Sequence, residues 1–241
     1  MSILKILFPD CYSCKACGVE IIKGTEFCDK CKKEIRLIDG KTCKCCGTEI
    51  KRGGDVCLSC RHRAYYFDKN YAVFPYTEAV KKLIVKYKTT HALYLTDFLV
   101  DGLYNKFIKE NIDVDVISYV PCTKRSEKLK GFSHARELAT KLAKKVGLPL
   151  FDDVAKIKET APQKELPLKE RVQNVVGAFK VNQRLNGKRV LIVDDKFTTG
   201  ATMSEMAKEF RKAGASVVLG LTLSVNDEYA PSTAKTIENI E

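Results

Sequence analysis

Eight of the eleven cysteines form two copies of one spacing pattern, and this repeat constrains the fold more than any other feature. Both copies read C-x-x-C-G-x-x-I-x-x-G-x-x-x-C-x-x-C, the first over residues 14–31 and the second over residues 43–60. Every shared position is offset by 29 residues, which indicates the duplication of one small structural unit. The repeated cysteines are Cys14, Cys17, Cys28 and Cys31 in the first unit and Cys43, Cys46, Cys57 and Cys60 in the second.

The spacing within each unit is typical of a zinc site. A C-x-x-C pair places two thiolates on one tight turn, and two pairs complete a tetrahedral shell of four thiolates with Zn–S distances of about 2.3 Å. Disulfides are the alternative, but residues 1–9 contain only a short apolar run and no small-residue cleavage site, so nothing there indicates export. Without an oxidising compartment, metal is the better interpretation. We therefore predict two zinc ions with a structural role, since four thiolates leave no coordination position open and units this small need metal to fold.

The remaining cysteines leave some alternatives. Cys11 and Cys45 offer competing ligands, but the register of the repeat excludes both, and we expect them and Cys122 to be ordinary thiols. Spacing alone does not decide whether each zinc is held within one unit or shared across units. Tandem duplication favours ligation within a unit.

Beyond the metal module the chain predicts one α/β domain. A length of 241 residues with 45% hydrophobic content is enough for one ordinary domain in addition to the module, and no apolar run approaches the length of a membrane span. Strands alternating with helices imply a mainly parallel, doubly wound sheet. We expect strands at 71–76 (an edge, because of Pro75), 114–120 (the first buried parallel strand), 177–181, 190–193 and 216–225. We expect helices near 77–87, 95–107, 132–146 (stopped by Gly147 and Pro149), 169–175 and after 202, loops at 122–131 and 158–168, and a frayed tail from Asn226.

Residues 190–202, which read V-L-I-V-D-D-K-F-T-T-G-A-T, suggest a cradle for a ribose phosphate. The apolar run predicts a buried strand, and the following helix begins after the threonines, so backbone amides converge where an anion can bind. The hydroxyls of Thr198, Thr199 and Thr202 add donors, and Gly200 lets the backbone approach the anion. Asp194 and Asp195 are acceptors when ionised and suit a ribose diol or hydrated Mg²⁺. An ordinary βα turn with an aspartate cap is the alternative.

This stretch resembles the phosphoribosyl-pyrophosphate motif of type I phosphoribosyltransferases. The resemblance implies a ribose and phosphoribosyl-pyrophosphate site made of Asp194, Asp195, Lys196, Thr198, Thr199, Gly200, Ala201 and Thr202, with Mg²⁺ bound together with the ligand. Lys196 departs from the apolar residue usual in that family. Its ammonium can touch a phosphate or neutralise the acidic pair, and the sequence does not decide between these roles.

Further segments resemble the ComF family, specifically its ComFC type, from about Leu4 to Ser224. They are Phe8-Pro9, the stretches V-P-C-T-K-R at 120–125 and K-G-F-S-H-A at 130–135, T-A-P-Q at 160–163, and L-x-x-R-x-x-N-V-x-G-A-F at 168–179. The resemblance implies a double zinc-finger domain over 1–64 and a type I phosphoribosyltransferase-like domain over 65–241. Lys130 replaces the family's arginine, and Ser133-His134 replaces Asn-Gln.

A second anion site is expected after the strand that ends near residue 120. Pro121, Cys122, Thr123, Lys124 and Arg125 can present amides and cations to a pyrophosphate, although a plain basic surface loop would look the same. We assign accessory roles to Lys130, Arg171 and Asn174. The latter two either reach the ligand or pin the 158–168 loop. We expect His134 to be a surface residue of a first helical turn.

Two functions remain open at this point. The formal charge is +12, and with eight thiolates and two zinc ions it is about +8. The basic clusters therefore permit a polyanion partner, although most runs of basic residues are solvated helix faces. The ComF resemblance implies a protein of natural transformation and DNA uptake that binds single-stranded DNA or a DNA-translocation partner in the cytoplasm and retains the phosphoribosyl-pyrophosphate site. Implied partners are a DNA-uptake helicase and recombination-loading proteins, which would bring it to the inner face of the membrane. The alternative is an active phosphoribosyltransferase with a nucleobase or amido acceptor. Tyr12, Tyr65 and Tyr66 can stack on bases or simply pack.

Overall fold

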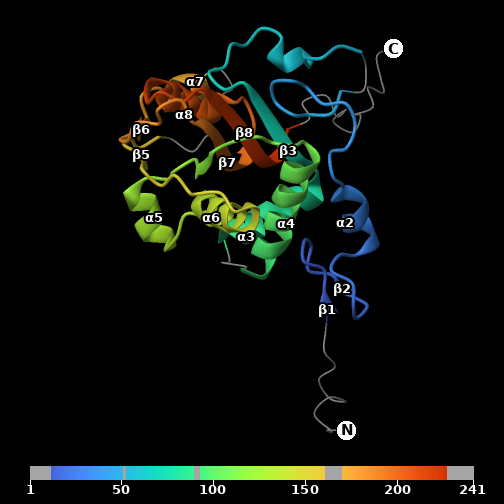
Figure 1. The fold of residues 1–241 in the computed structure, drawn as a ribbon. Coiled ribbons are helices and arrows are strands. Elements are labelled where there is room, and N and C mark those ends of the chain that lie inside the picture. The colour runs from blue at the N-terminus through green and yellow to red at the C-terminus, as the bar shows by residue number, and fades with distance from the viewer. Residues whose placement is uncertain (1–11, 51–52, 90–92, 161–169, 227–241) are drawn as a thin grey trace, which may run out of the picture.

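The computed structural model describes residues 12–50, 53–89, 93–160 and 170–226, and a four-stranded parallel sheet forms its centre (Figure 1). The strand order is β3 (Lys69–Pro75), β8 (Val217–Val225), β7 (Arg189–Phe197) and β4 (Val116–Tyr119), and every neighbouring pair is parallel. Residues 190–193 are fully buried in β7, as their continuous apolar run predicted.

Helices cover both faces of this sheet. One face packs against α3 (Glu78–Thr89), α4 (Leu93–Lys109) and α6 (His134–Val146), and the other against α8 (Ala201–Lys212), α7 (Glu170–Val175) and the hairpin of β5 (Val154–Lys156) and β6 (Phe179–Val181). The spacing of Met203, Met206, Ala207 and Phe210 explains this for α8, because all four are buried on one helix face. The predicted doubly wound, mainly parallel sheet is therefore confirmed.

The second cysteine unit covers the free edge of β3, the edge strand that Pro75 predicted. The amide of Asn70 donates to the carbonyl of Cys45 at 2.8 Å, and the amide of Ile38 donates to the carbonyl of Val73 at 2.8 Å. Gly47 lies so close to this strand that a Cβ would stand 2.6 Å from the Asn70 carbonyl oxygen. The metal module and the sheet thus form one packed structure, in which the module shields an edge that would otherwise be open to pairing.

Two sequence expectations need correction. The strand at 114–120 is β4, which forms the opposite edge of the four-stranded sheet, and β3 is the first parallel strand in the chain. The segment expected to be a loop at 122–131 contains helix α5 (Lys124–Lys130). The hydroxyl of Thr123 caps it by accepting from the amide of Ser126 at 3.2 Å, and Gly131 ends it with a φ of 80°. The charged helix lacks an apolar face, so its pattern resembles a loop. The predicted loop over 161–168 and the tail beyond Asn226 lie outside the described residues.

Candidate metal centres and ligand cavity

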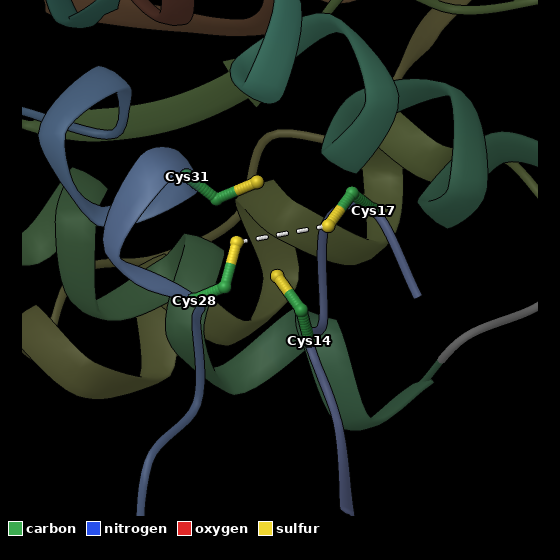
Figure 2. Close-up of side chains that lie close together, drawn as sticks. All are labelled: Cys14, Cys17, Cys28 and Cys31. Atoms are coloured by element: carbon green, nitrogen blue, oxygen red, sulfur yellow. Dashed lines mark hydrogen bonds between the residues drawn. The ribbon is translucent and has the colours of Figure 1, made fainter. Parts of the chain in front are cut away.

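The repeated cysteines gather into two groups of four. In each group the Sγ atoms lie within 4.8 Å of one another, and Figure 2 shows the first group, Cys14, Cys17, Cys28 and Cys31. The second consists of Cys43, Cys46, Cys57 and Cys60. The Sγ atoms of Cys17 and Cys28 are 3.8 Å apart and those of Cys46 and Cys57 are 3.6 Å apart. A tetrahedral zinc with Zn–S bonds of about 2.3 Å requires sulfur separations near ~3.8 Å, so both groups fit one zinc each. Each group consists of cysteines from one unit, which is the arrangement that tandem duplication favoured.

The two units also have the same backbone geometry after their first cysteine pairs. The amide of Gly18 donates to the carbonyl of Cys14 at 2.9 Å, and the amide of Gly47 donates to that of Cys43 at 3.0 Å. Both glycines have left-handed backbones, with φ of 79° and 77°. The glycine after each first cysteine pair is therefore needed to turn the chain around the metal.

A cavity of about 720 Å³ opens where the parallel strands end. A residue just beyond the end of each strand lines it: Tyr76 after β3, Asn226 after β8, Thr198 after β7 and Pro121 two residues after β4. This edge is where open α/β sheets bind their ligands, and the volume is typical of sites for small molecules. The buried Oδ1 of Asn226 has no hydrogen-bond partner within the part of the chain that the structure describes, which leaves an acceptor for a ligand.

Most residues of the expected ligand site line this one cavity. They are Asp194, Asp195, Lys196, Thr198, Gly200, Ala201 and Thr202 from the β7–α8 connection, together with Pro121 and Cys122 from the end of β4. Thr199 does not line it. Its hydroxyl accepts from the amide of Ala201 at 3.3 Å, and its carbonyl faces the opposite side of the turn.

The acidic pair has a cationic partner that the sequence did not reveal. The Nζ of Lys88, near the end of α3, lies 2.5 Å from Oδ2 of Asp195 in the cavity wall. Asp194 turns its Oδ1 to the amide of Asp195 at 2.8 Å. The Nζ of Lys196 lies over the ring of Tyr76, 3.2 Å from the ring centre. Lys88 is therefore a counter-ion that the structure gives to Asp195.

This arrangement separates the two carboxyl groups electrostatically. Burial, together with the neighbouring Asp195 charge, raises the pKa of Asp194 well above its usual range. Burial also opposes ionisation of Asp195, but the Lys88 ammonium outweighs it and lowers the pKa of Asp195. The pair therefore favours the negative charge on Asp195, and a cation or a hydroxyl donor beside Asp194 would favour its ionisation.

The first turn of α8 also lines the cavity. Gly200 is the N-cap of this helix, and Ala201, Thr202 and Met203 in its first turn line the cavity wall. The positive end of the helix dipole therefore faces the cavity, which favours an anion there. The structure shows a conformational and packing reason for a glycine at position 200. Its φ is 76°, and an added Cβ would stand 2.5 Å from Phe197 and 2.7 Å from Tyr65.

Gly200→Ala is accordingly expected to lower the free energy of unfolding by about 3 kcal/mol or more, since it adds a clash to the left-handed strain. Gly147→Ala is the matched control, because Gly147 has a φ of 73° with nothing within 4 Å of its added Cβ. We expect it to cost only about 1 kcal/mol. Chemical denaturation of both variants measures the difference, and equal losses would contradict the packing role of Gly200.

A third wall comes from α6 and the hairpin side. His134 is only 8% exposed, so the expectation of a surface histidine is wrong. Its ring lies between Phe132, at 4.2 Å, and Tyr87, at 5.2 Å between centroids, and it lines the cavity. Lys156 also lines the cavity, and its Nζ donates to the hydroxyl of Thr160 at 2.6 Å. His134 stood in the segment 130–135 that resembles the ComF family, but its place in the cavity was not expected there, and Lys156 stood in no marked motif.

Several expected site residues lie elsewhere. Thr123 is buried as the cap of α5, while Lys124 and Arg125 are exposed on that helix and do not line the cavity. Asn174 lies on α7, also outside the lining, and the side chains of Lys130 and Arg171 are outside the described part of the structure. Of the five residues expected in the pyrophosphate loop, Pro121 and Cys122 line the cavity.

Charge pairing decides which basic clusters are available to a partner. Nζ of Lys141 lies 2.9 Å from Oδ1 of Asp97, and Lys145 pairs with Asp101 in the same way. These α6 lysines are therefore largely neutralised by α4. Lys124, Arg125 and Lys128 on α5 are exposed and have no ion pair among the described residues.

Comparison with known families gives two matches. Residues 112–240 match the phosphoribosyl transferase domain and residues 3–63 match the double zinc ribbon domain. Both agree with the predicted fold class of a type I phosphoribosyltransferase-like sheet behind a zinc-ribbon module. Among solved structures, a purine phosphoribosyltransferase from Pyrococcus horikoshii is 22% identical with a TM-score of 0.38, covering 56% of this chain and 75% of that one.

Curated relatives match the chain over a shorter segment. Competence protein F of Haemophilus influenzae is 35% identical over 89 residues, which cover 35% of this chain and 39% of the relative. The DNA utilization protein YhgH of Escherichia coli is 30% identical over 105 residues, covering 43% of this chain and 46% of the relative. The match therefore spans less than half the length of these relatives. Among the described helices, none combines the length and apolar character needed to cross a membrane.

Proposed function

This chain is a ComF-family protein with a phosphoribosyl transferase domain behind a double zinc ribbon, and from that premise we propose that it acts in the cytoplasm on imported DNA and retains a site for phosphoribosyl pyrophosphate with Mg²⁺. The relatives named for competence and for DNA utilization support a role in DNA uptake. One observation carries the ligand site: the N-terminus of α8 and a carboxylate pair line the same cavity.

In the proposed complex the 5'-phosphate binds at the first turn of α8, with the Thr198 and Thr202 hydroxyls as donors. The ribose diol donates to Asp195, and Asp194 ionises beside it. Two carboxylates that line a cavity are a donor set that Mg²⁺ accepts together with phosphate oxygens, so the residues fit this ion. When bound, Mg²⁺ neutralises charge on the pyrophosphate. Lys88 must then share Asp195 with the ligand or turn toward its phosphates.

DNA binding is proposed for the exposed cations of α5. Lys124, Arg125 and Lys128 lie on a helix whose Ser126 borders the cavity, so a polyanion held there would run past the cavity mouth. Tyr66 is 52% exposed and can stack on a base, whereas Tyr65 packs against Phe67 with ring centres 4.7 Å apart.

We expect the triple variant K124Q/R125Q/K128Q to weaken single-stranded DNA binding and to reduce the slope of log K against log salt by about 0.7 for each lost phosphate contact. Fluorescence anisotropy of a labelled oligonucleotide over about 50 to 200 mM salt measures it. K141Q/K145Q is the control, because these lysines are already paired. An unchanged slope in the triple variant, or an equal change in the control, would remove α5 as the DNA contact.

Turnover is the second candidate, and the space beside the hairpin favours it. Phe179, Val175 and Lys156 also line the cavity, whose volume of about 720 Å³ is large enough for an acceptor beside the sugar. In such a reaction the bond from ribose C1 to pyrophosphate breaks, a C1–N bond to a nucleobase or amido nitrogen forms, and the acceptor nitrogen loses a proton. Release of pyrophosphate only when an acceptor is present would establish this activity.

A further inference from the structure

The turn proposed to bind the 5'-phosphate is held from behind by the segment that leaves the second cysteine unit. Nη1 of Arg63 and the hydroxyl of Tyr65 both donate to the carbonyl of Thr199, at 3.1 and 3.2 Å. The same hydroxyl lies 3.7 Å from Sγ of Cys60, one of the four ligands of the second metal group. One side chain therefore contacts both the metal unit and the turn.

The ring of Tyr65 has little freedom to move independently of its surroundings. It stacks on Phe67 at 4.7 Å and meets the edge of Phe197 at 6.3 Å between centroids. Its Cε1 also lies where a Cβ on Gly200 would clash. A displacement of Tyr65 would therefore change the packing of Phe197 and Gly200, which lie at the two ends of the turn.

The two donors to the Thr199 carbonyl complement each other. A tyrosine hydroxyl has one proton, so when Tyr65 donates it to a zinc-bound thiolate it cannot also donate it to the carbonyl. The guanidinium of Arg63 then remains as a donor to Thr199. Both side chains belong to a short segment whose beginning is fixed by Cys60, so their positions depend on the metal.

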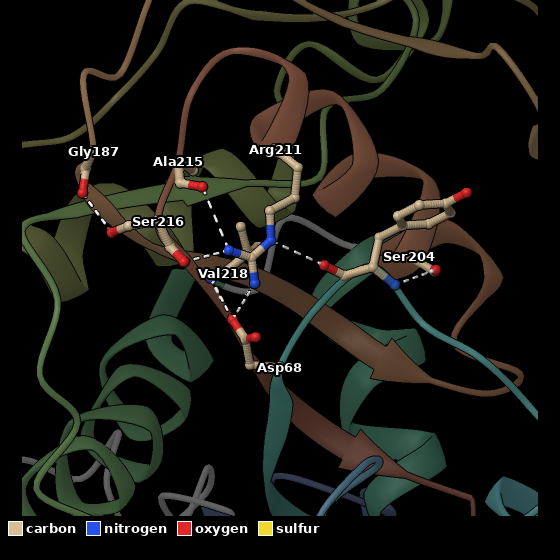
Figure 3. A network of polar contacts seen from close by, with 8 residues as sticks. Asp68, Gly187, Ser204, Arg211, Ala215, Ser216 and Val218 are labelled. Carbon is tan, nitrogen blue, oxygen red and sulfur yellow. Dashed lines mark hydrogen bonds and ion pairs between the residues drawn. The ribbon is translucent and has the colours of Figure 1, made fainter.

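The far end of this segment is anchored without metal, as Figure 3 shows. The amide of Tyr66 donates to the hydroxyl of Ser204 on α8 at 3.1 Å. Asp68 accepts from Nη2 of Arg211 at 2.5 Å and from the amide of Val218 at 2.8 Å. Residues 66–68 are therefore fixed to α8 and β8, and only the stretch between Cys60 and Tyr65 relies on the second zinc for its position.

There is also space into which the turn can move. A groove of about 410 Å³ lies behind it, bordered by Arg63, Tyr66, Val172 and Ser204, with Thr199 and Ala201 in its wall. Ala201 lines the main cavity as well, so the turn lies between the main cavity and this groove.

We propose that Arg63 and Tyr65 are positioning residues that couple metal binding in the second cysteine unit to the conformation of the 198–200 turn. The consequence for the ligand rests on the proposed function: when the second zinc is lost, the turn loosens and its affinity for a sugar phosphate falls. No described contact connects the first cysteine unit to the 198–200 turn. We therefore expect the first zinc to stabilise the fold without affecting this turn.

Hydrogen exchange of the ligand-free protein tests the coupling without reference to function. R63M/Y65F, which removes both donors and keeps the ring, is expected to retain two zinc ions while backbone amides of residues 198–202 exchange about fivefold to tenfold faster. R61M/Y66F is the control and should leave these amides unchanged. Unchanged exchange in R63M/Y65F would overturn the proposal.

The repeat offers a second, matched pair. Cys28 and Cys57 occupy equivalent positions in the two units, so C28S and C57S are each expected to lose one zinc. Only C57S should speed exchange in the 198–202 turn, and equal effects from both variants would overturn the coupling. Isothermal titration of the same variants with ribose 5-phosphate separates the outcomes. Faster exchange with no ribose 5-phosphate binding in any protein would support the coupling and contradict the proposed ligand.

Discussion

Asp195→Asn is expected to weaken the binding of phosphoribosyl pyrophosphate in the presence of Mg²⁺ by about 100-fold. The change keeps the size of the side chain but removes the negative carboxylate, which would accept hydrogen bonds from the ribose diol and attract the metal. Two lost charge-assisted contacts at about 1.5 kcal/mol each account for that factor. The Asp195 side chain is only 17% exposed and lines the cavity, so water replaces these contacts poorly. Isothermal titration calorimetry measures the affinity.

Asp115→Asn is the matched control. Asp115 also forms an ion pair, with Oδ1 2.8 Å from Nη2 of Arg189, but this pair lies at the beginning of β7 and the cavity lies at its end. We expect the control to bind the ligand as the wild type does. If both variants bind like the wild type, Asp195 has no role in the ligand site.

The same substitution has a pH signature in stability. Because Lys88 lowers the pKa of Asp195 below the ordinary value of 3.8, the ion pair stabilises the folded state above that pH and is lost as the pH falls through the lowered pKa. The stability difference between wild type and Asp195→Asn is therefore expected at neutral pH and should vanish in strong acid. Adding Lys88→Met to Asp195→Asn should recover part of the stability and none of the binding, because it removes a half-buried cation that has lost its partner.

Removing both zinc ions is expected to unfold the metal module completely. Structural zinc contributes about 10–16 kcal/mol in small cysteine-ligated units, as much as or more than the net stability of a whole domain, about 5–15 kcal/mol. The effect should extend beyond residues 12–60. Cys14 and Cys31 pack in the core on the α4 face of the sheet, and Cys43, Cys46 and Cys60 pack in the core on the α8 face.

Near-ultraviolet circular dichroism with a chelator, followed by zinc titration, measures this. We expect loss of the signal on chelation and recovery at two zinc ions per chain. Hydrogen exchange should show β3 losing protection together with the module, because the amide of Asn70 depends on Cys45 and the carbonyl of Val73 accepts from Ile38. A zinc-free protein that keeps protection across residues 12–60 would show that the cysteine groups fold without metal.

Sequence patterns predicted the features that depend on local spacing. The 29-residue offset located both metal groups, and the apolar run of residues 190–193 located the buried strand and hence the cavity edge. Gly147 was expected to stop the helix over 132–146, and it ends that helix with a left-handed backbone in the structure. Each of these signals is carried by residues close together in the chain.

The features that the sequence missed depend on distant packing. Lys88 is one of several lysines on α3, and its pairing with Asp195, 107 positions away, follows from how α3 crosses the sheet. His134 faces the cavity because α6 begins there, and no pattern around it marks that orientation. Thr198 and Thr202 line the cavity, whereas Thr199 does not and its hydroxyl accepts from the amide of Ala201, so three similar threonines in the motif do not share one environment.

A crystal structure with phosphoribosyl pyrophosphate and Mg²⁺ tests the central proposal most directly. We predict the 5'-phosphate at the first turn of α8, the ribose hydroxyls beside Asp194 and Asp195, and a lengthened contact between Lys88 and Asp195. An intact pair between Lys88 and Asp195, with no ligand at the 198–202 turn under saturating conditions, would contradict it.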